Sequence, residues 1–72
     1  MQLSTETIAA IREHAYEFPN EEVCGFVLGN GEIFRCKNSH QTPDKNFAIA
    51  TTEFIKAPAA IAAIYHSHTF IS

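Results

Sequence analysis

The stretch VCGFVLGNGEIFRCK, residues 23–37, decides the fold of this chain. Its first six residues, 23–28, form a dense apolar run of strand length. Gly29-Asn30-Gly31 follows as a turn, and residues 32–37 then alternate apolar and polar side chains. The stretch therefore predicts a β-hairpin.

The residues before the hairpin predict an amphipathic helix over 5–17. Ser4 or Thr5 can cap its start, Glu6 suits the positive end of the helix dipole, and Pro19 ends the run. Apolar residues recur at helical spacing, at Ile8, Ile11, Ala15 and Phe18. These four side chains are expected to form the face of the helix that packs on the sheet.

The residues after the hairpin predict a polar loop over 38–46 and a short strand over 47–51. A brief helix capped by Thr51 or Thr52 is expected next, followed by a strand at 61–66 with the apolar density of a buried one. The order helix, hairpin, strand, short helix, strand describes a mixed sheet with flanking helices, in the α/β or α+β class.

The length of the chain and the residues near its end limit how the domain can be organised. Seventy-two residues allow one domain with a thin core. The final strand leads into a polar cluster close to Ser72, with nothing after it to cover the sheet. The chain is therefore expected to be truncated, and its uncovered sheet predicts self-association.

Charge and hydropathy exclude two classes of partner. The net charge is -3 and the five Lys and Arg are scattered, so there is no basic stripe for nucleic acid. The first residues lack the pattern of a signal peptide, and the longest apolar run, 57–65, is interrupted by Pro58 and too short to span a bilayer. We expect a soluble, cytoplasmic protein that binds neither nucleic acid nor membrane.

Cys24 and Cys36 are not in a C-x-x-C arrangement, and nothing in the sequence implies export to an oxidising compartment. Free buried thiols are the favoured interpretation. A Cys24 nucleophile is the weaker alternative, because no local signature supports it.

His66 and His68 are separated by one residue, so in a strand both imidazoles point the same way and can converge on one ion. Imidazole nitrogen is a good zinc ligand. The competing interpretation is two ordinary histidines at a strand end, and the spacing alone does not decide between them.

Glu21 and Glu22 precede the first strand, where the simplest role is a solvated acidic edge. A carboxylate beside a zinc site is also the base that metal-assisted hydrolysis needs. His14 and His40 receive no role, and Asp44 is expected to make turn hydrogen bonds after Pro43.

The segments PNEEVCGFVLG (19–29) and IYHSH (64–68) together resemble the JAMM metalloprotease family, also called the MPN or JAB-type domain. In that family a glutamate precedes an apolar strand that contains Gly, and a later strand ends in His-x-His. The resemblance covers nearly the whole chain and implies a cytidine-deaminase-like architecture.

The resemblance implies that Glu22 is the general acid/base and that His66 and His68 bind zinc; Glu21 is the alternative base if the register is one residue off. It also implies hydrolysis of amide or isopeptide bonds in a protein or peptide substrate, such as a ubiquitin-like protein or a phage tail protein. The short form here looks most similar to relatives in phage tail assembly.

The chain departs from the family pattern after His68. Thr69 stands where Pro is usual, and the family's third zinc ligand, an Asp, and its oxyanion-stabilising Ser have no counterpart; Ser72 is too close to His68 to be assigned. Residues 1–72 are therefore expected to be the N-terminal part of one JAMM/MPN-like domain with an incomplete site. The alternative is a catalytically inactive scaffold or interaction module of the same fold.

Overall fold

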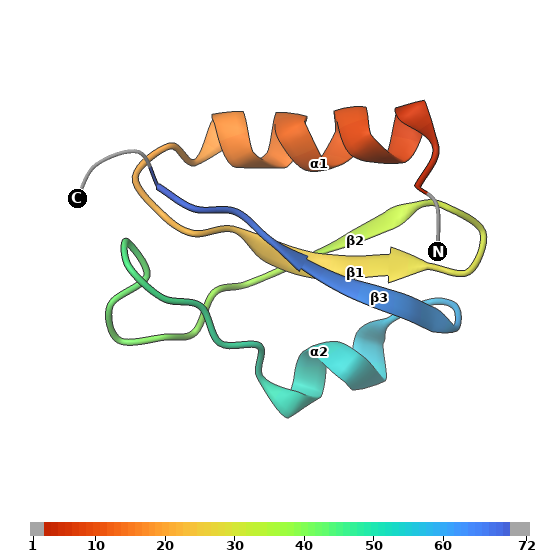
Figure 1. Cartoon of the computed structure of the whole chain (residues 1–72). Helices are drawn as coiled ribbons and strands as arrows, with labels where there is room; N and C mark the ends of the chain where they lie inside the picture. Colours follow the sequence, from red (N-terminus) through yellow and green to blue (C-terminus); the bar gives the residue numbers. More distant parts are fainter. Residues whose placement is uncertain (1–2, 70–72) are drawn as a thin grey trace.

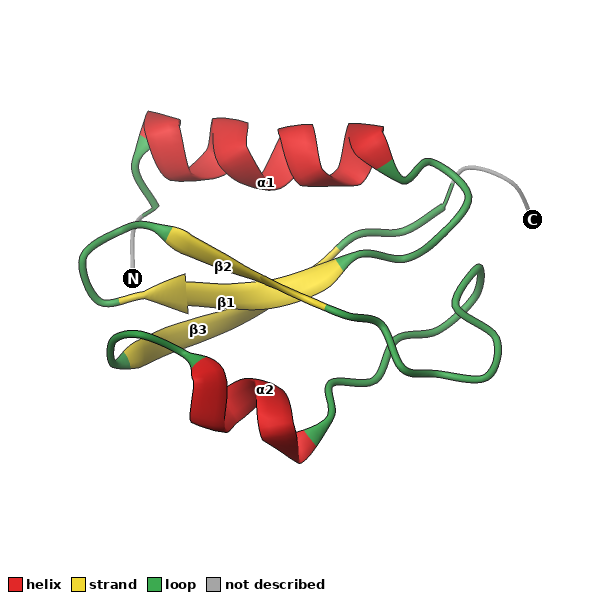
Figure 2. Cartoon of the chain, turned by 180° about the vertical axis from the view of Figure 1, so that it is seen from behind, coloured by secondary structure: helices red, strands yellow, loops and turns green. Residues whose placement is uncertain are grey.

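The computed structural model describes residues 3–69, in which a three-stranded sheet lies between two helices (Figures 1 and 2). The strand order is β2-β1-β3, and both neighbours of β1 run antiparallel to it. The elements in chain order are α1 (Thr5–Glu17), β1 (Cys24–Leu28), β2 (Ile33–Cys36), α2 (Thr51–Lys56) and β3 (Ile61–His66). The chain has a mixed α+β fold.

The predicted mixed sheet is wrong for the described residues, because every strand pairing there is antiparallel. The turn at 29–32 reverses the chain directly from β1 into β2, with Gly31 at a φ of 89°. α2 then leads the chain back to this turn, where the Gly29 amide donates to the Ala60 carbonyl (2.9 Å). β3 therefore starts beside the end of β1 and runs against it.

Helix α1 begins and ends where the sequence predicts, with the Ser4 side chain accepting a hydrogen bond from the Thr7 amide (3.1 Å). Its buried face is the predicted one only in part, because Ile11 and Ala15 pack against the sheet as expected. Thr7 and His14 are buried, whereas Ile8 and Phe18 are exposed. The two buried polar side chains have partners: the Thr7 hydroxyl donates to the Gly31 carbonyl, and His14 is hydrogen-bonded to the Tyr65 hydroxyl.

Strand β1 sends alternate side chains to the two faces of the sheet. Cys24, Phe26 and Leu28 pack on the side of α2, where Phe54 contacts the Phe26 ring. Val23 and Val27 pack on the side of α1, together with Tyr65 of β3, Ile11 and Ala15. All residues of β1 are buried, so the central strand forms the core of both layers.

Two predictions about residues 47–56 need correction. Residues 47–51 do not form a strand. The Ala48 carbonyl accepts from the Ser39 amide (3.0 Å), but the Ala48 amide donates to the Asn38 side chain and not to a neighbouring strand. Helix α2 has Ala50 at its N-cap with no side-chain cap, so neither threonine caps it as predicted.

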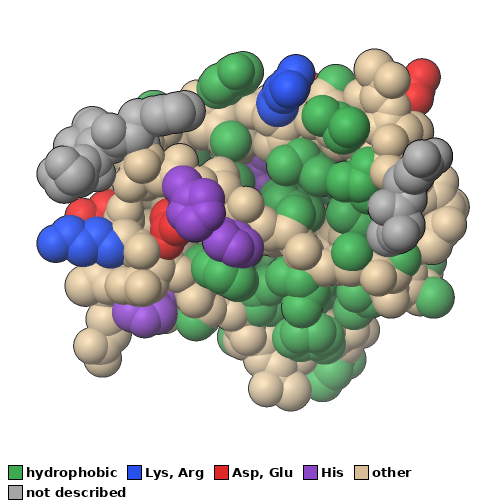
Figure 3. All heavy atoms as spheres, in the orientation of Figure 1, with side chains coloured by type: hydrophobic (Ala, Val, Ile, Leu, Met, Phe, Trp, Pro, Cys, Tyr) green, Lys and Arg blue, Asp and Glu red, His purple; other side chains and the backbone are tan. Residues whose placement is uncertain are grey.

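Strand β3 spans the predicted residues, but it is not a buried strand: only Tyr65 is buried, and Ile64 is 51% exposed. It lies at the edge of the described sheet and α2 covers only part of its face. Figure 3 shows hydrophobic side chains gathered at the surface on this side of the molecule, and Ile55 of α2 is 80% exposed. Within residues 3–69, neither helix combines the length and apolar character that crossing a bilayer requires.

Candidate metal centre

The register between β1 and β3 places Glu22 opposite His68. Cys24 pairs with His66 in the sheet. The pairing continues one step further, because the Ser67 amide donates to the Val23 carbonyl and the Val23 amide donates to the Ser67 hydroxyl, both at 2.9 Å. The next pair along this ladder is Glu22 and His68, and the Glu22 Oε1 atom lies 3.2 Å from His68 Nδ1.

The structure brings together the three residues predicted from the sequence. One ligand atom from each of Glu22, His66 and His68 lies within 4.8 Å of the others. The two imidazole rings are edge to face, with centroids 4.9 Å apart. As expected from the i, i+2 spacing, both histidines are on the same face of the strand, which is also the face of Glu22.

The three residues differ in burial: Glu22 is buried, and the two histidines are exposed. The Glu22 side chain is 7% exposed and that of His68 is 81% exposed. His66 is also exposed, and Figure 3 shows a pair of adjacent histidines at the surface with acidic atoms beside them. The carboxylate is therefore fixed in the protein, whereas the imidazoles face the solvent from which an ion or a substrate arrives.

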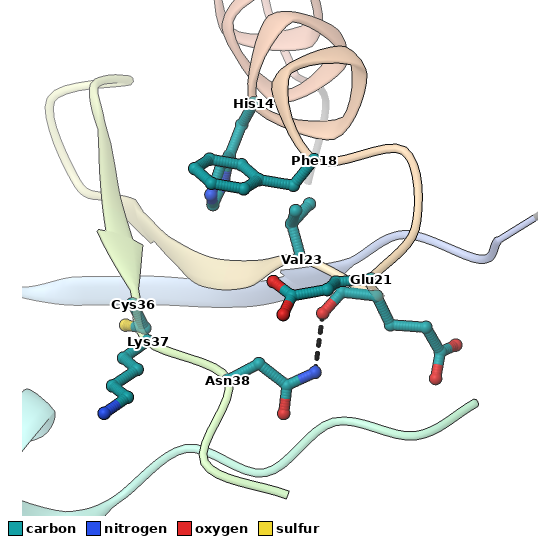
Figure 4. Close-up of a pocket in the computed structure, with 8 residues that line it drawn as sticks. His14, Phe18, Glu21, Val23, Cys36, Lys37 and Asn38 are labelled. Carbon is teal, nitrogen blue, oxygen red and sulfur yellow. Dashed lines mark hydrogen bonds between the residues drawn. The ribbon is translucent and has the colours of Figure 1, made fainter. Parts of the chain in front are cut away.

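Backbone hydrogen bonds hold Glu22 in place. Its amide donates to the Pro43 carbonyl (2.6 Å), and its carbonyl accepts from the Asn38 side-chain amide (2.7 Å), the bond drawn in Figure 4. Glu22 is thus attached to the loop of residues 38–48, which we call the site loop.

The site loop also contacts the two histidines or their neighbours. The Phe47 ring stacks on the His66 ring, with centroids 4.3 Å apart and planes 17° from parallel. The Thr69 hydroxyl, next to His68, donates to the Asp44 carbonyl (2.8 Å). Asp44 itself lies outside the cluster of possible ligands and belongs to the turn over 42–46, where the Asn46 amide donates to the Thr42 carbonyl.

A hollow of about 250 Å³ lies beside Glu22, between the last turn of α1, the start of β1 and the end of β2 (Figure 4). Its volume is enough for several water molecules. Its lining residues are His14, Phe18, Glu21, Glu22, Val23, Cys36, Lys37 and Asn38. The hollow gives the otherwise buried carboxylate of Glu22 a neighbouring space for small molecules.

His14, a buried residue of α1, is one of the titratable groups that line this hollow. Its Nδ1 atom is 2.6 Å from the Tyr65 hydroxyl. Burial lowers the pKa of His14, the nearby Arg35 lowers it further, and Glu17 opposes the shift. Burial also raises the pKa of Tyr65, so His14 and Tyr65 are a neutral hydrogen-bonded pair at neutral pH.

The remaining candidates do not join the cluster. Glu21 is exposed and contributes no ligand atom, so Glu22 and not its neighbour belongs to the cluster. His40 is exposed in the site loop, accepts a hydrogen bond from the Thr42 amide and lies outside the cluster. Ser72 lies outside the described residues.

The two cysteines are free and buried, as predicted. Burial raises the pKa of the Cys36 thiol to about 11, helped by the charge of Glu53 and by Cys24, and burial likewise raises the pKa of Cys24. Thiols with raised pKa values are poor nucleophiles near neutral pH, so the structure gives no support to a Cys24 nucleophile.

Sequence reasoning missed the residues that hold the candidate ligands: Ser67, Asn38 and Phe47. Ser67 was within the His-Ser-His motif, but its bond to Val23 depends on the strand register. Asn38 and Phe47 reach the site through a loop that has no periodic pattern. The only available signal was the high content of turn-forming polar residues over 38–46.

The donor set fits zinc. Two imidazoles and one carboxylate are among the commonest ligands of catalytic zinc sites, with bonds of about 2.0–2.2 Å. Ligand atoms around a tetrahedral ion are about 3.4 Å apart. Glu22 Oε1 and His68 Nδ1 already meet this spacing at 3.2 Å, so any adjustment concerns the remaining separations, which are within 4.8 Å. The exposed side chains of His66 and His68 can make this adjustment by rotating about their χ angles.

Comparison of the chain with models of protein families, with curated proteins and with solved structures found no match. The function is therefore argued from the residues and geometry of the site.

Proposed function

We propose that this chain provides the zinc-binding and acid/base part of a JAMM-type metallopeptidase or isopeptidase that hydrolyses amide bonds in a protein or peptide substrate. One observation carries the proposal: Glu22 of the first strand and His66 and His68 of the last strand, 44 or more residues apart in sequence, meet within 4.8 Å. These are the residues that the family resemblance assigns to acid/base catalysis and to zinc.

The chemistry divides among the three side chains. His66 and His68 hold the ion, and zinc when bound supplies a Lewis acid that lowers the pKa of water and polarises a carbonyl oxygen. Glu22 accepts the proton of the attacking water and then delivers it to the nitrogen of the leaving amine. The buried, backbone-anchored position of Glu22 suits this role, because a base must stay at a fixed distance from the proton that it moves.

Catalytic zinc sites normally have three protein ligands. If Glu22 serves as the base, the two histidines leave one position, which the resemblance assigns to an Asp beyond the residues printed here. The proposal includes this step: residues 1–72 form the N-terminal part of a JAMM/MPN-like domain with a cytidine-deaminase-like architecture, and the last ligand comes from outside them.

The test is a zinc-dependent hydrolysis assay. The 72-residue chain, alone and joined to the coding sequence that follows it, is incubated with zinc and a mixture of linear peptides and peptides carrying an isopeptide-linked lysine, and new amino groups are identified by mass spectrometry. We expect the longer chain to show cleavage that a chelator abolishes and that His66→Ala removes. Zinc binding without cleavage of any peptide would instead support the alternative, an inactive scaffold of the same fold.

A further inference from the structure

The site loop, residues 38–48, touches the candidate centre at three places. Its contacts are Pro43 with Glu22, Phe47 with His66, and Asp44 with Thr69, which follows His68. Each contact reaches a different member of the cluster or its neighbour, so the loop adds a second set of contacts to the strand register that places the three candidate residues.

The side chain of Asn38 organises this loop. Its Nδ2 group donates to the carbonyls of Glu22 (2.7 Å) and Asn46 (2.8 Å), and its Oδ1 atom accepts from the amides of His40 (3.0 Å) and Ala48 (3.1 Å). One half-buried amide thus uses both its donor and its acceptor groups. The Asn46 and Ala48 bonds flank Phe47, the residue that stacks on His66.

We infer that Asn38 is a positioning residue of the metal centre: it ties the backbone of Glu22 to the segment that presents Phe47 to His66. The inference rests on the proposed zinc site. Partners that orient metal ligands without touching the metal are known to affect metal affinity by about 10- to 100-fold. A side chain that fixes the base and one ligand together belongs to this class.

The chain offers a matched pair of substitutions, Asn38→Asp and Asn46→Asp. Both lie in the site loop and both add one negative charge. Asn46→Asp removes one side-chain donor, the one to the Thr42 hydroxyl. Asn38→Asp removes the donors to the carbonyls of Glu22 and Asn46. It keeps the oxygen that accepts from the amides of His40 and Ala48. The difference between the two variants therefore measures positioning and not charge.

Cobalt(II) serves as the probe, because its visible absorption reports the ligand geometry as well as the affinity. We expect Asn38→Asp to weaken cobalt binding by about 10- to 100-fold and to change the absorption spectrum, while Asn46→Asp matches the unmodified chain in both. Circular dichroism checks that each variant keeps its secondary structure. Equal affinities and spectra for the two variants would overturn the inference.

Hydrogen exchange on the unmodified chain gives a second test that does not depend on how the variants fold. Coupling between the loop and the metal is reciprocal, so zinc must slow exchange of the His40 and Ala48 amides, which are bonded to Asn38. The Glu32 amide, bonded in the same way to Asn30, is the control and must not change. Unchanged exchange at all three amides when zinc is bound overturns the Asn38 inference alone, whereas absence of metal binding by the unmodified chain overturns the zinc site and this inference with it.

Discussion

At the scale of single residues, Gly25 shows how closely β1 and β3 pack around the site. A Cβ atom at Gly25 would lie 2.5 Å from the Tyr65 hydroxyl and 2.6 Å from the Phe34 carbonyl oxygen. The Tyr65 side chain, whose hydroxyl is hydrogen-bonded to His14, therefore occupies the space that any larger residue at position 25 would need. The requirement for glycine here comes from this close approach.

We predict that Gly25→Ala lowers the free energy of unfolding by about 1–3 kcal/mol, because overpacking forces the Tyr65 ring or the backbone of Phe34 to move. Urea denaturation measures the change. Gly29→Ala is the matched control, since the nearest atom to its Cβ is the Ala60 carbonyl oxygen at 3.7 Å, an ordinary contact. Equal stabilities of the two variants would show that the core beside Tyr65 is looser than described.

The role of Glu22 is also decided at this scale. If it is the base, Glu22→Gln keeps zinc binding and lowers the rate of hydrolysis by about 10²- to 10⁴-fold. Glu21→Gln, which changes the exposed neighbour, must leave both quantities unchanged. Loss of zinc binding in Glu22→Gln, to the same extent as in His66→Ala, would make Glu22 a ligand and require a different base.

At the scale of elements, the contact between α1 and the sheet carries a titratable group in its interior. Burial lowers the pKa of His14 from its ordinary value of 6.5, so the unfolded chain binds a proton at His14 at a pH where the folded chain does not. The contribution of buried, neutral His14 to the free energy of unfolding is therefore fully present above pH 6.5 and is lost as the pH falls below that value.

We predict that the free energy of unfolding decreases as the pH falls below about 6.5, by at most about 1.4 kcal/mol per pH unit from this one group. His14→Gln, which can still bond the Tyr65 hydroxyl, should flatten the dependence, and His40→Gln should keep it. Denaturation midpoints at several pH values measure the slopes. A slope that His14→Gln leaves intact would assign the pH dependence to other groups.

The elements themselves differ in how well the sequence predicts them. The bounds of α1 and β3 follow from local signals, namely the Ser4 cap, the stop at Pro19 and the apolar run at 61–66. The segment 47–51 looks equally like a strand, but it forms none, and the Ala48 amide donates to the Asn38 side chain. That bond joins residues ten apart in a loop, and no local pattern indicates it.

At the scale of the whole molecule, the site lies at one end of the sheet, where β1 begins and β3 ends. The sequence predicted the three candidate residues because each is attached to a strand end and to a recognisable motif. It did not predict the contacts of Ser67, Asn38 and Phe47, because these depend on register and on the path of the site loop. Motifs therefore indicated which residues lie together, and the antiparallel topology determines which residues contact them.

The most direct test of this account is calorimetric titration of zinc into the unmodified chain and into His66→Ala, His68→Ala and His40→Ala. We predict binding of one zinc ion per chain, weakened strongly by each of the first two substitutions and unaffected by the third, which removes an exposed imidazole outside the cluster. No binding, or binding that His66→Ala and His68→Ala leave unchanged, would contradict the assignment of Glu22, His66 and His68 as a metal centre.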